Sequence, residues 1–85
     1  MLFYEVQSLE LLGKYDEAIE KGNILRNRET NYKILILLSE CYYLNMQEEQ
    51  ARFVLWSGIE NGIQNVEIYQ LYAEYNKDYN NVIAE

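Results

Sequence analysis

Few side chains in this 85-residue sequence could do chemistry, and none of them stands in a catalytic pattern. Cys41 is the single cysteine, and the sequence has no histidine that could act as its base or complete a zinc site. The carboxylate pairs Asp16-Glu17 and Glu48-Glu49 each lie where a helix is expected to begin, and a helix N-terminus stabilises negative charge without any catalytic role. A glycine-rich phosphate loop is also absent. We therefore expect no enzymatic activity, no metal and no cofactor.

Cys41 also bears on the compartment. One cysteine cannot form an internal disulfide, which favours a reducing environment. At mid-helix between Leu38 and Leu44, the thiol is predicted to be a small buried hydrophobic group rather than a nucleophile. The longest apolar run, residues 34–38, is far shorter than the ~20 residues needed to cross a bilayer, and no basic leader precedes a cleavable apolar stretch. We expect a soluble, cytoplasmic protein.

The charge balance narrows the choice of partners. Seven Lys and Arg residues against fourteen Asp and Glu residues give a net charge of −7, which repels a phosphate backbone and an anionic membrane surface. Residues 45–85 have two positive and seven negative groups. We expect a protein or peptide partner, with basic segments favoured by the C-terminal half, and neither nucleic acid nor membrane.

The positions of apolar residues predict helices. Leu2, Val6, Leu9 and Leu12 recur at helical spacing and stop at Gly13, a residue suited to closing a helix. The same reasoning predicts helices over residues 15–26, 31–44, 48–60 and 65–75, followed by a turn at 76–78 into a sixth helix. Residues 34–38 alone would also suit a buried strand, but apolar segments of about ten residues with a 3.6-residue period favour helices.

The sequence repeats itself at a distance of 33 residues. This shift places Leu11 on Leu44, Asp16 on Glu49 and Ala18 on Ala51, and a second shift places Tyr42 on Tyr75. Periods of this length made of two helices are typical of solenoids, in which each hairpin is covered only by its neighbours.

Residues 12–19, with the sequence Leu-Gly-Lys-Tyr-Asp-Glu-Ala-Ile, resemble the turn and second-helix start of a tetratricopeptide repeat. The resemblance implies an all-α fold in which antiparallel helix hairpins stack as a right-handed superhelix of about 2.5 repeats and five to six helices. It implies one domain over residues 1–85, with repeats at about 1–30 and 31–62 and a partial repeat at about 65–85. The proline that usually closes a repeat is replaced by Thr30 and by Ile63.

Tetratricopeptide repeats bind peptides or helices in a groove lined by the first helix of each hairpin. By the resemblance, the groove of this chain is lined by side chains from its first two hairpins: Phe3, Gln7, Glu10, Lys33, Ile36, Glu40 and Tyr43. An alternative is that Ile36 and Tyr43 pack against the neighbouring hairpin. Members that hold a C-terminal carboxylate use a cluster of Lys, Asn and Arg, whereas Lys33 is nearly alone here, so that role is not expected.

The resemblance therefore implies a protein-interaction module of a scaffold or adaptor. Two alternatives remain open. One is self-association, as in tetratricopeptide subunits of the anaphase-promoting complex, which residues 37–44 resemble. The other is a peptide-sensing domain that regulates an attached effector. Phe53 and Trp56 also have two readings, since they would either lie under the fifth helix or form an exposed apolar anchor.

Overall fold

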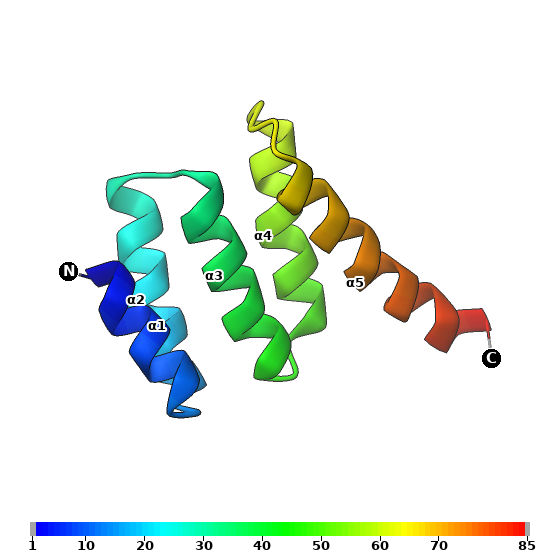
Figure 1. The fold of residues 1–85 in the computed structure, drawn as a ribbon. Helices are drawn as coiled ribbons and strands as arrows, with labels where there is room; N and C mark the ends of the chain where they lie inside the picture. Colours follow the sequence, from blue (N-terminus) through cyan, green and yellow to red (C-terminus); the bar gives the residue numbers. More distant parts are fainter. Residues whose placement is uncertain (1, 85) are drawn as a thin grey trace.

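The computed structural model describes residues 2–84, and the side-chain surroundings of residues 2–77 (Figure 1). Between residues 2 and 84 the chain forms helices only, with no strand. All-α architecture, predicted from the periodicity, is confirmed. The helices are α1 (Leu2–Leu11), α2 (Tyr15–Arg28), α3 (Tyr32–Leu44), α4 (Glu48–Glu60) and α5 (Val66–Ala84).

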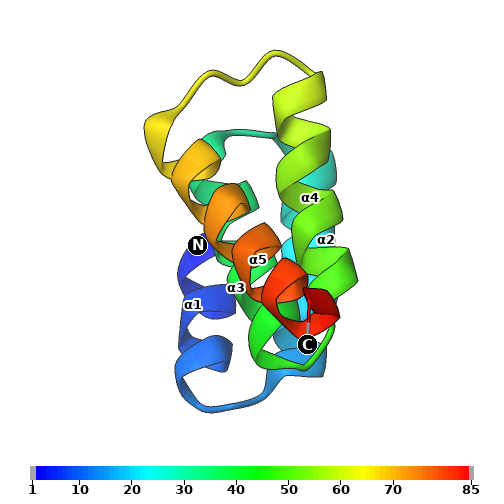
Figure 2. The ribbon, with the colours of Figure 1, turned by 90° about the vertical axis from the view of Figure 1, so that its right-hand side faces the viewer.

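Each helix packs against its neighbours in the chain. Helices α1 and α2 form one antiparallel hairpin, α3 and α4 form the next, and α5 packs against α4. Contacts also join α1 to α3 and α3 to α5, so the first helices of successive hairpins touch. Figure 2 shows α1 and α3 on one side of the molecule and α2 and α4 on the other, with α5 crossing diagonally. This layering is what a stack of hairpins requires.

Three helices end in the same hydrogen-bonded turn. After α1 the amide of Gly13 donates to the carbonyl of Glu10, and the next amide donates to the carbonyl of Leu9. The same pair of bonds closes α3 at Met46 and α4 at Gly62. In each case the central residue has positive φ: 78°, 65° and 88° in chain order. This is the Schellman ending. Met46, one repeat after Gly13, shows that the stack requires this conformation even without glycine.

The core is centred on α3. Leu35 and Leu38 are fully buried, and each lies against a glycine of a neighbouring helix. A Cβ built on Gly22 of α2 would lie 2.8 Å from Cδ1 of Leu38, and one built on Gly58 of α4 would lie 2.5 Å from Cδ1 of Leu35. The absent side chains therefore let α2 and α4 approach α3 from two sides. Ala18 and Ala51, small residues at equivalent repeat positions, are also fully buried.

One predicted boundary is wrong. The fifth helix was expected to end near Tyr75, with a turn at 76–78 and a sixth helix beyond, but α5 runs without interruption from Val66 to Ala84. Asn and Asp cost a helix interior only about 0.5–0.7 kcal/mol each, and neither glycine nor proline is present there to end the helix. The end of α5 projects away from the stack in Figure 1.

Candidate functional site

Helices α1 and α3 place five of the seven predicted groove residues around one hollow. It has a volume of about 230 Å³, and its walls come from α1, α3 and the first turn of α5. The residues of the hollow are Phe3, Gln7, Lys33, Ile36, Leu37, Glu40 and Glu67. A second hollow of about 220 Å³ shares Phe3 and Lys33 with the first, so the two adjoin. We call this pair of hollows the groove.

The groove has an apolar wall and a charged rim. Phe3 and Ile36 are half-buried and Leu37 is buried, so their side chains form the apolar part. Lys33 and Glu67 are exposed. A hollow of this size holds a side chain or two rather than a drug-sized molecule, whose pockets start at about 300 Å³. The groove is therefore suited to anchoring side chains of an extended partner.

Glu10, predicted as a groove residue, does not line the hollow but lies beside it in a polar cluster. Its Oε2 accepts a hydrogen bond from the Cys41 thiol, with an Sγ to Oε2 distance of 3.6 Å. Glu10 also forms a hydrogen bond with Glu40, which joins two carboxyl groups across the contact between α1 and α3. Burial raises the pKa of Glu10, and burial followed by repulsion from Glu10 raises the pKa of Glu40. One carboxyl must hold a proton for the two to share a hydrogen bond.

Cys41 is fully buried, as predicted. Burial, and then the negative charge of Glu10 and Glu40, raises the pKa of the thiol to about 12. The thiolate is the nucleophilic form of cysteine, and at neutral pH almost none of it would be present. The environment thus favours an inert thiol.

Tyr43, the remaining predicted groove residue, is engaged inside the protein. Its ring stacks on that of Tyr75, with ring centroids 4.3 Å apart and planes within 5° of parallel. Tyr75 is buried, and burial raises the pKa of its phenol, with Glu40 contributing further. Tyr43 therefore links α3 to α5, which agrees with the alternative that it packs against the next hairpin.

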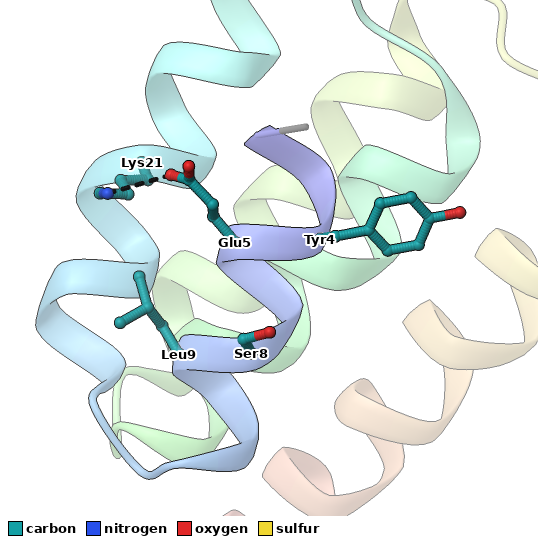
Figure 3. Close-up of a pocket in the computed structure, with 5 residues that line it drawn as sticks. All are labelled: Tyr4, Glu5, Ser8, Leu9 and Lys21. Carbon is teal, nitrogen blue, oxygen red and sulfur yellow. Dashed lines mark hydrogen bonds and ion pairs between the residues drawn. The ribbon is translucent and has the colours of Figure 1, made fainter.

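A larger hollow lies elsewhere, at the outer side of the first hairpin (Figure 3). Its volume is about 390 Å³, and it is lined by residues that the sequence reasoning did not select: Tyr4, Glu5, Ser8, Leu9 and Lys21. The ammonium group of Lys21 donates a hydrogen bond to Oε2 of Glu5 at 3.1 Å. The two charged residues that line this hollow therefore already pair with each other. Both side chains are about half exposed, and such a surface pair contributes at most about 1 kcal/mol.

Between residues 2 and 84, no helix combines the length and apolarity needed to cross a membrane. Among the side chains described, those of residues 2–77, no three His, Cys, Asp or Glu residues are grouped so that they could hold a metal ion.

Sequence reasoning missed Glu67 and Tyr75 as neighbours of the groove. Shifting the predicted residues by one further repeat selects Tyr69 and Ala73 on the fifth helix, and not Glu67. Glu67 reaches the hollow because α5 crosses the stack diagonally (Figure 2). The repeat that matched Tyr42 to Tyr75 did indicate an aromatic residue at a core position, but not its stacking partner.

No family model matches the sequence, and neither the curated proteins nor the solved structures yield a match.

The carboxyl pair gives a pH-dependent prediction. We expect Glu40→Gln to raise the melting temperature at pH 7 and to have a smaller effect near pH 4. The pKa of Glu40 is raised in the folded state, so the folded state binds protons more tightly than the unfolded state. Stability from this group is therefore complete below its ordinary pKa of 4.5 and is lost as the pH rises through the raised value. An amide keeps the hydrogen bonding without the charge.

The matched control is Glu20→Gln, which changes the net charge equally at an exposed position of α2. Thermal denaturation followed by circular dichroism at both pH values measures the difference. If Glu40→Gln lowers the melting temperature at pH 7 relative to the control, the ionised pair is stabilising and our account of it is wrong.

Proposed function

We propose that this chain is a protein-interaction module of tetratricopeptide type, without catalytic activity, which binds an extended peptide or a helix of a partner protein in the groove. One observation supports this most directly. Five of the seven residues assigned to the groove from the tetratricopeptide resemblance, among them Gln7 on α1 and Ile36 on α3, surround a single hollow. Stacked hairpins form a binding surface from equivalent residues of successive repeats, so the residues that line one hollow are expected to lie some thirty positions apart in the sequence.

The fold adds support for the tetratricopeptide resemblance. The 33-residue repeat corresponds to identical helix endings at Gly13 and Met46, and to buried alanines at Ala18 and Ala51. Helices in contact are neighbours in the chain or first helices of successive hairpins. These are the expected properties of hairpin solenoids.

The groove also indicates the chemistry of its partner. An apolar side chain would fit against Phe3 and Ile36, and a basic side chain would meet Glu40 or Glu67 at the rim. Lys33 is the cation of the groove and would meet an acidic group. A mixed apolar and basic peptide is therefore the favoured ligand. The buried, protonated thiol of Cys41 suits a reducing compartment, and we propose the cytoplasm.

Filling the groove tests this proposal. Gln7 is exposed and lines the hollow, so Gln7→Trp should block the groove without disturbing the core. We expect this variant to capture at least about tenfold less of the physiological partner in quantitative pull-downs, a loss of about 1.4 kcal/mol. The partner would first be isolated from an extract of the source cells with the unmodified protein.

The control is Ser8→Trp, because Ser8 is the next residue, is equally exposed and faces the hollow of Figure 3 instead. Circular dichroism checks that both variants are folded. Equal capture by the two variants would place the binding surface outside the groove. Tyr43→Ala is less suited to this experiment, since the loss of the stack on Tyr75 would also disturb α5.

A further inference from the structure

A line of four exposed residues runs along α4 on the face opposite the core. Glu49, Phe53, Trp56 and Glu60 follow one another at intervals of four, three and four residues, which places them in one row on a helix. Phe53 is 64% exposed and Trp56 is 43% exposed. The row has an acidic residue at each end and two aromatic residues between them. We call it the α4 stripe.

The first hairpin provides an internal comparison for the stripe. One repeat earlier, the equivalent positions on α2 hold only polar residues: Asp16, Glu20, Asn23 and Asn27. The hairpin thus folds without aromatic residues on this face. The packing of α4 does not require Phe53 either, because α4 buries the opposite face through Ala51, Val54, Leu55 and Gly58. Asn23, the equivalent of Trp56, is half-buried and donates a hydrogen bond to the Tyr42 hydroxyl of α3, so this edge of the face contacts the next hairpin. Phe53 lies on the solvated part of the face, and its exposed ring needs another explanation.

The apolar surface continues from α4 onto α5. The Trp56 ring contacts the Tyr72 ring, with centroids 5.6 Å apart and an angle of 36° between the planes. Tyr69, one turn before Tyr72 on α5, is 45% exposed. Two aromatic side chains of α5, Tyr69 and Tyr72, thus widen the surface, and Tyr72 packs against Trp56. Trp56 was expected either to lie under the fifth helix or to be exposed. Both expectations are partly right, because Trp56 packs against Tyr72 of α5 and is still 43% exposed.

We propose that the α4 stripe binds an amphipathic helix of a partner protein, which presents two apolar residues between two basic residues at the spacing of the stripe. Its Lys or Arg side chains would pair with Glu49 and Glu60, and its apolar residues would pack on Phe53 and Trp56. No residue of α4 lines the groove, so the proposal does not depend on the groove.

Charge selects this occupant over a second copy of the chain. If two stripes paired in antiparallel orientation, Glu49 of each would face Glu60 of the other, and in parallel orientation like residues would face each other. Both arrangements bring carboxylates together in a chain whose net charge is −7. Arg52, beside the stripe, is half-buried and already interacts within the protein, so it offers little compensation. The favoured partner is therefore basic.

The test uses Trp56 as its own reporter, since it is the single tryptophan. The probe is a synthetic helical peptide with Lys, Leu, Leu and Lys at the spacing of the stripe and Ala and Gln elsewhere. We expect a saturable blue shift of the tryptophan emission on titration, and weaker binding as salt is added. A peptide of the same composition with the two leucines on opposite faces should bind about tenfold more weakly or not at all.

Charge exchange supplies the decisive comparison. The variant with both Glu49→Lys and Glu60→Lys should no longer bind the Lys peptide and should instead bind a peptide in which Glu replaces each Lys. Its circular dichroism spectrum should stay unchanged. Phe53→Glu, which restores the residue type of the first hairpin, should weaken binding about tenfold, whereas Leu11→Glu, at an exposed apolar position of α1, should not. Equal binding of both peptides by the wild type, no exchange of preference, or a concentration-dependent doubling of mass in light scattering would overturn the proposal.

Discussion

Leu38→Ala is expected to leave a large fraction of the protein unfolded at 25 °C. Leu38 is fully buried in α3, where it lies against Gly22 of α2 and belongs to the main core cluster. Removing a buried leucine side chain costs about 2–5 kcal/mol, because the apolar contact is lost and a cavity remains. A core of this size supplies only about 3–5 kcal/mol of net stability. One substitution can therefore cancel nearly all of it.

Urea denaturation followed by circular dichroism measures this loss. Leu44→Ala is the control on the same helix, because Leu44 is 49% exposed and its truncation should cost well under 1 kcal/mol. A Leu38→Ala protein with an unfolding midpoint close to that of the control would mean that α3 is not the centre of the core.

Gly58→Val is expected to be the second most disruptive change, at about 1–3 kcal/mol. The position of Cβ would be 2.5 Å from Cδ1 of Leu35, so this fully buried side chain or the helix backbone would have to shift. The new side chain would therefore push α4 away from α3. Gln50→Val, at an exposed position of α4, measures the cost of placing valine in this helix without the clash.

A second substitution should rescue the first. Leu35→Val removes the δ carbon that the Gly58→Val side chain would meet, so the double variant should lose less stability than the sum of the two single variants. Additive losses in urea denaturation would show that Gly58 is not needed for close approach.

The helices were predictable where a single residue dictates the backbone. Gly13 and Gly62 end α1 and α4 as expected, because positive φ is easy for glycine. The fifth helix was predicted too short because Asn76 has only a weak preference against helix, and that preference is overridden when nothing else interrupts the segment. Met46 adopts positive φ without a glycine, although the turn itself was expected there, between the helices predicted over residues 31–44 and 48–60.

The groove was predictable only as far as the repeat extends. Gln7, Lys33, Ile36 and Glu40 lie together because equivalent positions of α1 and α3 face the same side. The position of Glu67 depends instead on the angle at which α5 crosses α3, and this angle results from packing between helices. No local pattern in the sequence encodes it.

The identical endings of α1, α3 and α4 also determine where the chain tolerates changes in length. Each ending fixes the rotation of one helix relative to the next. One residue inserted within α4 would turn the rest of that helix by about 100°, so that the positions of Leu55 and Gly58 would no longer face α3. The same insertion between Ile63 and Asn65, after the last such ending, would lengthen a connection and leave every helix face in register.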